Sequence, residues 1–358
     1  MQPKQCIAII DSIKAYAKQN PTEAQVYEDW LQAVVNLRDA LSQDKRFDAY
    51  KYSGELRSVC AAMMGKMKTG EDVAKVYDVI SRTYLFEAKD VFDSYCIYLE
   101  WNRAPEKKFY QPRRKVLKTV ANALQDLADD RLDLLAISMP PGCGKTALAI
   151  FYLTWLAGRN PDEPMLTGSH SNSFVRGVYD ECLRIFDKDG EYLWNDVFPD
   201  VTVSNTNAKD CRIDLGKRKR FETLEFTSIG TGNAGLYRAS TLLYCDDLVS
   251  GIEVALSKPR LDKLWETYTT DLRQRKIGNK CKELHIATRW SVHDVIGRLE
   301  QNYGDSDRNR FIVMPAMDEK DESNFDYDYG VGYSTETLRK QREVMDEMSW
   351  KALYMNQP

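Results

Sequence analysis

The chain has 358 residues, a length that predicts about two or three domains. Its formal net charge of -4 and its 29% of charged residues are ordinary for a globular protein, so any contact with nucleic acid must come from local basic patches. The eight cysteines are scattered without a CxxC pair, which argues against a disulfide framework. With only three histidines, a histidine-built metal centre is not expected, and the lack of a long apolar run argues against a membrane span. We therefore expect a cytoplasmic protein with reduced thiols.

Residues 1–104 are predicted to be helical throughout. Apolar residues recur there at helical spacing, as at Trp30, Leu31, Val34 and Leu37. This part shows no catalytic constellation. We interpret it as a helical accessory domain that ends near residues 102–105.

From Phe109 onward the pattern changes to alternating strands and helices. The predicted strands are Asp133–Ser138, Pro164–Gly168, Thr223–Ser228, Thr241–Cys245, Glu283–Ala287 and Phe311–Met314. Predicted helices between or after them include Ser173–Phe186, Lys258–Arg275 and His293–Asn302. This alternation predicts an α/β fold with a mostly parallel sheet over residues 105–317. Residues 318–358 begin with an acidic loop and end in two short helices.

The clearest motif follows the first predicted strand. The run Pro140-Pro141-Gly142-Cys143-Gly144-Lys145-Thr146 leads into an apolar helical stretch, which is the context of a phosphate-binding P-loop. The glycines let backbone N–H groups curl around anionic oxygens, and the helix start adds its positive end. We expect residues 141–144 to cradle the phosphates of ATP, Lys145 to reach the β- and γ-phosphates, and Thr146 to bind Mg²⁺. One departure is Met139, where the pattern GxxxxGK[ST] has glycine. A tight turn between core elements is the alternative interpretation.

A second motif is the apolar run Thr241–Cys245, which delivers Asp246 and Asp247 at its carboxyl end. This arrangement predicts a Walker B element in which Asp246 holds Mg²⁺ directly or through water. Asp247 is expected to polarise the water that attacks the γ-phosphate. An Asp-rich turn is the alternative interpretation, but its position after Lys145 in the same alternating domain favours the nucleotide site.

Weaker signals come from isolated side chains. Arg238 ends a glycine-rich loop and is a candidate cation for the γ-phosphate in the transition state, or else a surface arginine. Thr288 follows the strand Glu283–Ala287 and could sense the γ-phosphate, or it simply ends a strand anchored by Trp290. Gln111, beside two aromatic residues, could read the amino edge of adenine.

The basic run Lys217–Arg220 also has two interpretations. Such a run is usually a solvated turn. In a protein that moves nucleic acid, it would suit contact with phosphates regardless of base sequence.

Together these stretches resemble the ATPase domain of the large terminase subunit, the DNA-packaging motor of tailed bacteriophages. The resemblance covers about residues 105–358, and the order of the motifs is its specific part, because P-loops alone are widespread. The matching stretches are Phe109–Pro112, Met139–Thr146, the loop Gly230–Arg238 that runs into Leu243–Asp247, Ala287–Trp290 with Asp294 and Gly297–Leu299, Pro315–Ala316 and Ala352–Pro358.

The resemblance implies an ASCE-type P-loop ATPase core preceded by the all-helical N-terminal domain. The implied site residues are Gln111 for adenine, Lys145 and Thr146 as the Walker A pair, Asp246 for Mg²⁺, Asp247 as the catalytic carboxylate and Thr288 as the coupling residue. Asp247 is often Glu in relatives. Many relatives also carry an arginine in the loop where this chain has Pro141, so the arginine-finger role falls to Arg238, acting in trans.

The implied activity is ATP hydrolysis that drives double-stranded DNA into an empty procapsid. The implied partners are DNA, the portal protein, the small terminase subunit and further copies of the chain in a ring, a pentamer by family resemblance. The isolated chain is also compatible with a monomer. The implied location is the host cytoplasm, with transient docking on the portal.

Large terminases normally continue into a nuclease domain with an RNase H-like fold. The resemblance stops at Tyr354–Pro358, so that domain was either cut away or is a separate chain, and we expect no nuclease activity here. Two other functions stay open: another P-loop translocase or helicase-like ATPase, although no QxxGRxxR-like second core is present, and a nucleotide-gated interaction module without significant turnover.

Overall fold

The structure, a computed structural model, describes residues 1–231 and 235–358. The chain forms two compact units, Met1–Trp101 and Asn102–Pro358. No helix in the described ranges is both long and apolar enough to cross a membrane. All eight cysteines lie in those ranges, where each thiol is buried and unpaired.

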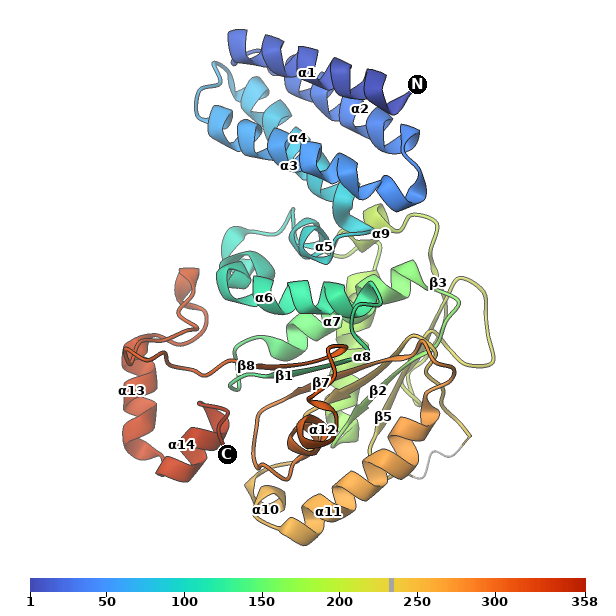
Figure 1. Ribbon diagram of the computed structural model, residues 1–358, viewed down its shortest axis with the longest axis vertical. Helices are drawn as coiled ribbons and strands as arrows, with labels where there is room; N and C mark the ends of the chain where they lie inside the picture. The colour runs from blue at the N-terminus through green and yellow to red at the C-terminus, as the bar shows by residue number, and fades with distance from the viewer. Residues whose placement is uncertain (232–234) are drawn as a thin grey trace. The chain divides into compact units, whose positions relative to one another are not determined.

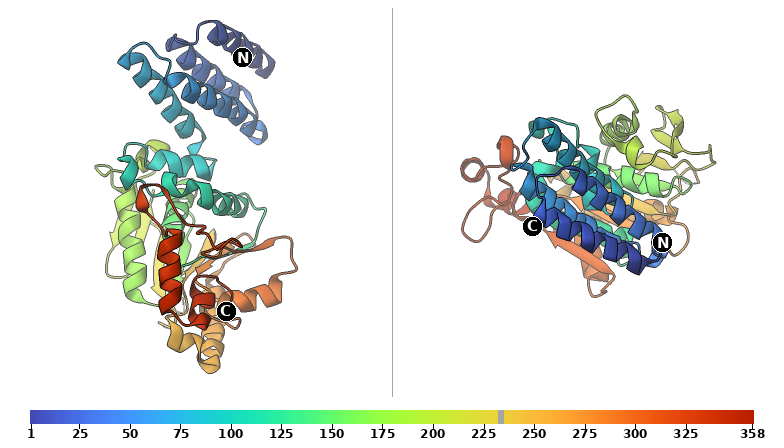
Figure 2. Two further views of the ribbon diagram at one scale, coloured as in Figure 1. Left: turned by 90° about the vertical axis from the view of Figure 1, so that its left-hand side faces the viewer. Right: turned by 90° about the horizontal axis from the view of Figure 1, so that it is seen from above.

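The first unit is helical, as the sequence predicts. Its elements are α1 (Pro3–Gln19), α2 (Gln25–Ala40), the 3₁₀ turn η1 (Gln43–Lys45), α3 (Phe47–Met64), α4 (Gly70–Ala88) and α5 (Phe92–Leu99). The helices α1 to α4 run side by side (Figures 1 and 2). Their shared core includes the predicted apolar positions Trp30, Leu31, Val34 and Leu37, all of which are buried. The helical periodicity therefore reflects packing inside this unit.

The second unit is built on a mostly parallel sheet, which confirms the predicted fold class. Among the described residues the sheet has eight strands in the order β3-β4-β5-β2-β6-β7-β1-β8. The strands are β1 (Leu134–Ser138), β2 (Met165–Ser169), β3 (Val203–Asn207), β4 (Arg212–Leu215), β5 (Leu224–Ser228), β6 (Leu242–Asp246), β7 (Lys282–Ala287) and β8 (Asn309–Val313). All six predicted strands are present. The sequence does not predict β3 and β4, which pair antiparallel at one end of the sheet.

Helices cover both faces of this sheet, with α6, α7 and α8 on one face and the α11 and α12 region on the other (Figure 1). The α-helices are α6 (Tyr110–Ala128), α7 (Lys145–Arg159), α8 (Asn172–Phe186), α9 (Trp194–Val197), α10 (Ile252–Ala255), α11 (Lys258–Thr267), α12 (Val295–Tyr303), α13 (Thr335–Val344) and α14 (Glu347–Leu353). Shorter turns are η2 (Pro105–Lys107), η4 (Arg273–Arg275) and η5 (Asp328–Gly330). The predicted helix Lys258–Arg275 is interrupted, because a π-helical turn, η3 (Tyr268–Leu272), follows α11.

The register of the parallel strands decides where the functional side chains meet. Ser138 at the end of β1 lies opposite Ala287 in β7, and Asp246 at the end of β6 lies opposite Ile286. On the other side of β6, Asp246 lies opposite Ser169 at the end of β2. The residues that follow these four strands therefore share one edge of the sheet, its carboxyl edge.

Candidate nucleotide-binding site

The predicted P-loop joins β1 to α7 through a turn that depends on two glycines. Gly142 and Gly144 have φ angles of 73° and 95°, in the left-handed region that side chains disfavour. Left-handed residues on either side of Cys143 make a concave turn of the kind that gathers N–H groups around an anion. Because α7 begins directly after this turn at Lys145, its positive end faces the same place.

Aromatic side chains from distant parts of the sequence close over this loop. The Tyr333 hydroxyl donates a hydrogen bond of 3.0 Å to the carbonyl oxygen of Pro141. A Cβ atom added to Gly142 would lie 2.7 Å from the Tyr333 oxygen, and one added to Gly144 would lie 2.6 Å from the Phe109 ring. The loop therefore requires glycine both for its backbone angles and for the space its neighbours leave.

We expect Gly142→Ala to weaken nucleotide binding by about tenfold or more, because the added methyl group meets both a strained φ and the Tyr333 hydroxyl. Gly278→Ala is the matched control, since Gly278 has a φ of 71° but open space around its Cβ position. Titration of each purified variant with a fluorescent ATP analogue measures the difference. Adding Tyr333→Phe removes the obstructing oxygen and should restore part of the affinity. Equal affinities for the two alanine variants would contradict this account of the loop.

Lys145 is the first residue of α7, and its side chain is buried. Its Nζ atom donates to the Thr288 hydroxyl at 3.0 Å and lies 3.6 Å from Oδ2 of Asp247. A buried ammonium group needs such partners, because removing a charge from water is costly. The lysine is thus held at the carboxyl edge of the sheet by groups from two neighbouring strands.

Asp246 ends β6 with a fully buried carboxyl group. The Tyr244 hydroxyl donates to its Oδ2 atom, whereas Oδ1 has no hydrogen-bond partner in the part of the chain that the structure describes. Burial first, and the neighbouring charge of Asp247 second, raise the pKa of Asp246 to about 7. The side chain of Thr146 has the opposite effect and lowers the pKa of Asp246.

An unsatisfied buried carboxylate oxygen near a threonine hydroxyl fits a divalent cation, because Mg²⁺ prefers oxygen ligands. Within the described ranges, no group of three or more His, Cys, Asp or Glu side chains could hold a metal ion. A cation at Asp246 would therefore need further oxygen atoms, such as those of phosphates and water, which Mg²⁺ ordinarily retains in nucleotide sites.

Asp247 adopts an unusual backbone conformation directly after β6. Its φ angle is 40°, in the left-handed region that costs energy for a residue with a side chain. Its N–H donates to the carbonyl oxygen of Ile286 at 2.9 Å, and its Oδ1 atom accepts the N–H of Thr288, also at 2.9 Å. Both contacts come from β7 and its continuation, so that strand fixes one side of Asp247.

Thr288 and Arg289 follow β7 and are both buried despite being polar. Thr288 contributes to the site, since its hydroxyl contacts Lys145 and its N–H contacts Asp247. The Arg289 guanidinium instead pairs with Asp294, the N-cap of α12, at 3.2 Å and with Glu300 at 3.4 Å. The arginine therefore anchors the end of β7 to α12, while the threonine faces the P-loop lysine.

The P-loop lysine, two aspartates and a threonine thus meet at one edge of the sheet. The chain is similar in structure to the large terminase of bacteriophage HK97. The sequences are 13% identical, the TM-score is 0.47, and the match covers 75% of this chain and 55% of the HK97 protein. This chain therefore spans little more than half the length of that terminase. No family model and no curated protein matches the sequence.

Gln111, the predicted adenine reader, lies exposed in the first turn of α6. Its neighbours Phe109 and Arg113 reach the P-loop, with carbon atoms 2.6 Å and 3.4 Å from the place a Cβ of Gly144 would take. Gln111 therefore belongs to a helical turn that borders the P-loop, and its contact with adenine stays a prediction.

Pro141 and Cys143 contribute their backbone to the loop. The Pro141 carbonyl accepts the Tyr333 hydrogen bond, and its ring leaves no N–H to donate. Burial raises the pKa of the Cys143 thiol to about 12. A thiol that stays protonated is a packing group rather than a nucleophile.

Arg238, the predicted arginine finger, lies at the opposite edge of the sheet from Lys145. It precedes β6, and its N–H donates to Oε2 of Glu225 at 3.0 Å. Its exposed guanidinium packs on the Phe221 ring, 5.2 Å from the centroid. This position does not bring Arg238 to the P-loop of its own chain, so a role in trans stays a prediction. Residues 232–234 of the preceding loop lie outside the described residues.

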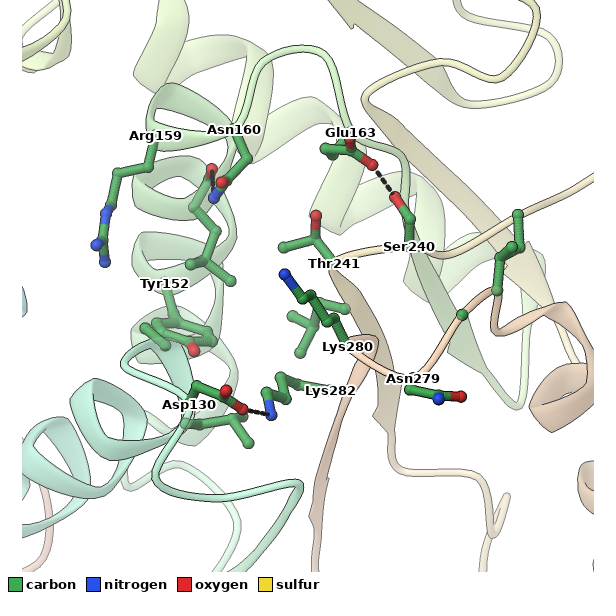
Figure 3. A pocket seen from close by; sticks show the side chains of 16 residues that line it. Asp130, Tyr152, Arg159, Asn160, Glu163, Ser240, Thr241, Asn279, Lys280 and Lys282 are labelled. Atoms are coloured by element: carbon green, nitrogen blue, oxygen red, sulfur yellow. Dashed lines mark hydrogen bonds and ion pairs between the residues drawn. The ribbon is translucent and has the colours of Figure 1, made fainter.

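A cavity of about 740 Å³ opens at the amino edge of the sheet, which is the edge opposite the P-loop (Figure 3). It lies between the end of α7 and the starts of β6 and β7. Tyr152 and Asn160 line it from α7 and the residue after it, and Lys280 lines it from the loop before β7. The cavity and Lys145 lie at opposite ends of α7. It is therefore separate from the P-loop site.

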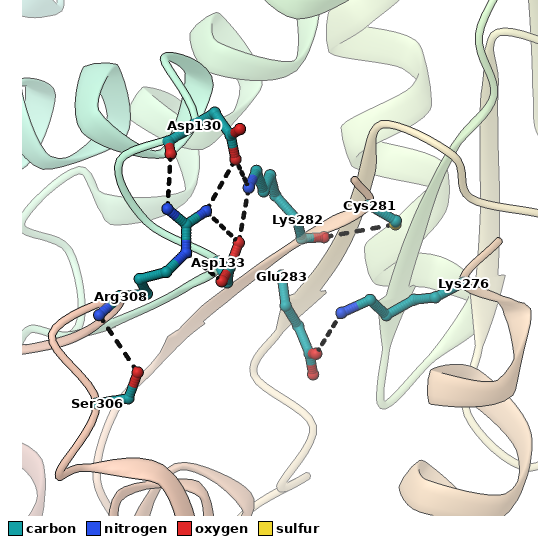
Figure 4. Close-up of polar contacts among 8 residues, drawn as sticks. All are labelled: Asp130, Asp133, Lys276, Cys281, Lys282, Glu283, Ser306 and Arg308. Carbon is teal, nitrogen blue, oxygen red and sulfur yellow. Dashed lines mark hydrogen bonds and ion pairs between the residues drawn. The ribbon is translucent and has the colours of Figure 1, made fainter. Parts of the chain in front are cut away.

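An ion-pair cluster borders the same edge (Figure 4). Lys282 and Arg308 both pair with Asp130 and Asp133. The hydrogen bonds from Arg308 are the main reason that the pKa of Asp133 is held well below its usual range. The cluster ties the segment before β1 to β7 and to the segment before β8, which is a structural role.

The basic run Lys217–Arg220 is partly structural. The Lys219 ammonium pairs with the buried carboxylate of Asp214 at 2.7 Å and donates to the carbonyl oxygen of Pro161 at 2.9 Å. The other three cations of the run are exposed. Lys219 therefore anchors the turn, which leaves the exposed members for any contact with nucleic acid.

Tyr333 and His170 contact the site, although no motif in the sequence indicates either residue. Tyr333 belongs to the nonperiodic segment after the core, where no sequence signal singles it out. His170 has Nδ1 2.7 Å from the Asp247 carbonyl oxygen and directly follows β2. A search for polar residues after every predicted strand, as made for Thr288, could have found it.

Proposed function

We propose that this chain is the ATP-hydrolysing motor subunit of a phage terminase, which moves double-stranded DNA into a procapsid. The observation that carries the ATPase part is the position of Lys145, whose ammonium lies 3.0 Å from the Thr288 hydroxyl and 3.6 Å from the Asp247 carboxylate beside a concave glycine loop. Phosphoanhydride hydrolysis needs a cation, an acid and the N-terminus of a helix, all in one place.

Each residue has a role that follows from its position. Lys145 would exchange its contacts with Thr288 and Asp247 for the β- and γ-phosphates of ATP. Asp246 and Thr146 would hold Mg²⁺, which neutralises phosphate charge when bound. Asp247 would accept a hydrogen bond from the attacking water and orient it. Thr288, released by Lys145, would then report the γ-phosphate to β7.

The terminase part of the proposal is supported by the order of the motifs along the chain. In this proposal the chain assembles as a ring on the portal protein, works with the small terminase subunit and contacts the DNA backbone through basic side chains. We place it in the host cytoplasm, docked transiently on the procapsid. Arg238 would act on the site of a neighbouring subunit. The proposal covers ATP hydrolysis and DNA movement.

We expect the purified chain to hydrolyse ATP in the presence of Mg²⁺ and double-stranded DNA, and Lys145→Ala to lower turnover at least about 100-fold. Lys188→Ala, which removes an exposed lysine outside both the P-loop and the basic run Lys217–Arg220, is the control and should leave turnover unchanged. Phosphate release measures both. Turnover that is insensitive to Lys145→Ala would contradict the site. Nucleotide binding by the wild type without any turnover would favour a nucleotide-gated interaction module instead.

A further inference from the structure

The position of the Asp247 carboxylate depends on a backbone conformation that the residue does not favour by itself. Its φ of 40° places it in the left-handed region directly after β6. Such a conformation persists only where surrounding contacts hold it. In an ordinary conformation the side chain would leave β6 in another direction, so these contacts also determine where the carboxylate points.

Asp247 has three polar groups, which are its backbone N–H, its backbone carbonyl and its carboxylate. Contacts from β7 and its continuation hold the N–H and the carboxylate. The N–H donates to Ile286, and the carboxylate accepts from the N–H of Thr288. Both partners are backbone groups of β7 or its continuation. These two hydrogen bonds cannot be removed by changing a side chain. They do not involve the Asp247 carbonyl oxygen.

The contact on the other side of β6 comes from His170. Its Nδ1 atom lies 2.7 Å from the Asp247 carbonyl oxygen, which is a short hydrogen-bond distance. A carbonyl oxygen only accepts, so Nδ1 must carry the proton. The next contact of this nitrogen, to the Ser169 hydroxyl, is 3.5 Å long and much weaker. The imidazole is therefore directed at the backbone of Asp247.

The local structure fixes the imidazole in this position. His170 lies between the buried Ser169, which ends β2, and Ser171, which caps α8 by accepting the N–H of Phe174 at 3.3 Å. The Phe174 ring packs beside it with a centroid distance of 5.9 Å. A strand end and a helix cap on either side leave the histidine backbone little freedom.

We infer that His170 is a positioning residue for the Asp247 carboxylate, an inference that rests on the proposed ATPase function. The Nδ1–H group holds the Asp247 carbonyl from β2 while β7 holds its N–H, so the strained residue is clamped between the two strands adjacent to β6. His170 acts on the backbone, and the attacking water meets only the carboxylate. Loss of the clamp therefore changes the rate of the chemical step and leaves nucleotide binding, which depends on Lys145 and the glycine loop, intact.

The choice of side chain provides a sharp test. The amide nitrogen of asparagine occupies nearly the place of histidine Nδ1 and can donate the same hydrogen bond. Leucine has nearly the shape of asparagine but no donor. We expect His170→Leu to lower kcat by roughly 10- to 100-fold with KM changed less than about twofold, and His170→Asn to retain most of the wild-type kcat.

The measurements use the full chain and phosphate release at varied ATP, together with affinity for a fluorescent ATP analogue and melting temperature. If His170→Leu fails to fold, His170→Gln replaces it, because the glutamine amide reaches the Nε2 position rather than Nδ1. Equal kcat values for the leucine or glutamine variant and the wild type would overturn the inference, as would equal losses in the asparagine and leucine variants. A wild type without ATP turnover would instead contradict the proposed function, and the inference with it.

Discussion

Asp246→Asn is expected to stabilise the nucleotide-free protein at pH 8 while it abolishes ATP hydrolysis. Burial and the neighbouring Asp247 raise the pKa of Asp246 from 3.8 to about 7, so the folded protein keeps a proton that the unfolded chain releases. The free energy of unfolding therefore falls as the pH rises from about 4 to about 7 and is level above that range. At about 1.4 kcal/mol per pKa unit, and with the charge shared between two neighbouring acids, we expect a gain of roughly 1–3 kcal/mol at pH 8.

The pH dependence of the Asp246→Asn effect shows whether the stabilisation comes from the buried charge of Asp246 or from a general effect of removing a charge. At pH 4 Asp246 is already largely protonated in the folded protein, so asparagine should change stability little there. Asp305→Asn removes an exposed carboxylate of the same unit and should have no comparable effect at either pH. Chemical denaturation at the two pH values measures the differences. An asparagine variant no more stable than the wild type at pH 8 would contradict the buried, charged state of Asp246.

Magnesium provides the functional half of the prediction. If Asp246 helps to hold Mg²⁺ with bound nucleotide, the cation should raise the melting temperature of the wild type in the presence of ADP, by mass action on the folded state. The asparagine variant should show the nucleotide effect without the magnesium increment. A site that lowers stability in order to hold a cation is a common form of the conflict between stability and activity.

The sheet was predictable because its central strands are buried on both faces. Such strands read as short apolar runs, as at Leu134–Ser138 and Leu242–Asp246, and the helices between them show a different period. β3 and β4 lack that signal. Val203–Asn207 is mostly exposed and polar, so its conformation depends on pairing with β4, which in turn pairs with β5.

The meeting of Lys145, Asp246, Asp247 and Thr288 was predictable for a related reason. Each residue ends or follows a predicted parallel strand, and parallel strands that are in register end at a common edge. Their catalytic roles stay predictions. Tyr333 could not be found in this way, because its place over Gly142 depends on the folding of a segment without periodicity. The edge of the sheet at which Arg238 lies could not be predicted either, because a sequence does not show where a long loop returns to the sheet.

Mixing two inactive variants is expected to restore ATP turnover if Arg238 completes the site of a neighbouring subunit. Asp247→Ala removes the carboxylate that orients water, and Arg238→Ala removes the cation proposed for the transition state, so each homogeneous protein should lose about 10³-fold in turnover. In a mixed ring, an Arg238→Ala subunit keeps Asp247 and can receive Arg238 from an Asp247→Ala neighbour. With equal amounts and random order, about a quarter of the interfaces combine both residues, because each partner is correct half of the time.

The location of Arg238 makes this experiment decisive. An arginine at the opposite edge of the sheet from its own Lys145 cannot serve that site without a large movement, whereas a head-to-tail interface brings opposite faces of neighbouring subunits together. Arg220→Ala is the matched control, because the Arg220 guanidinium also lies 5.2 Å from the Phe221 centroid and is exposed. That variant should keep its ATP turnover when the turnover is measured without DNA, since Arg220 belongs to the exposed basic run that is left for contact with nucleic acid. A mixture that co-purifies through a tag on one variant yet stays inactive would contradict the shared site and return the search for the finger to other cations of the chain.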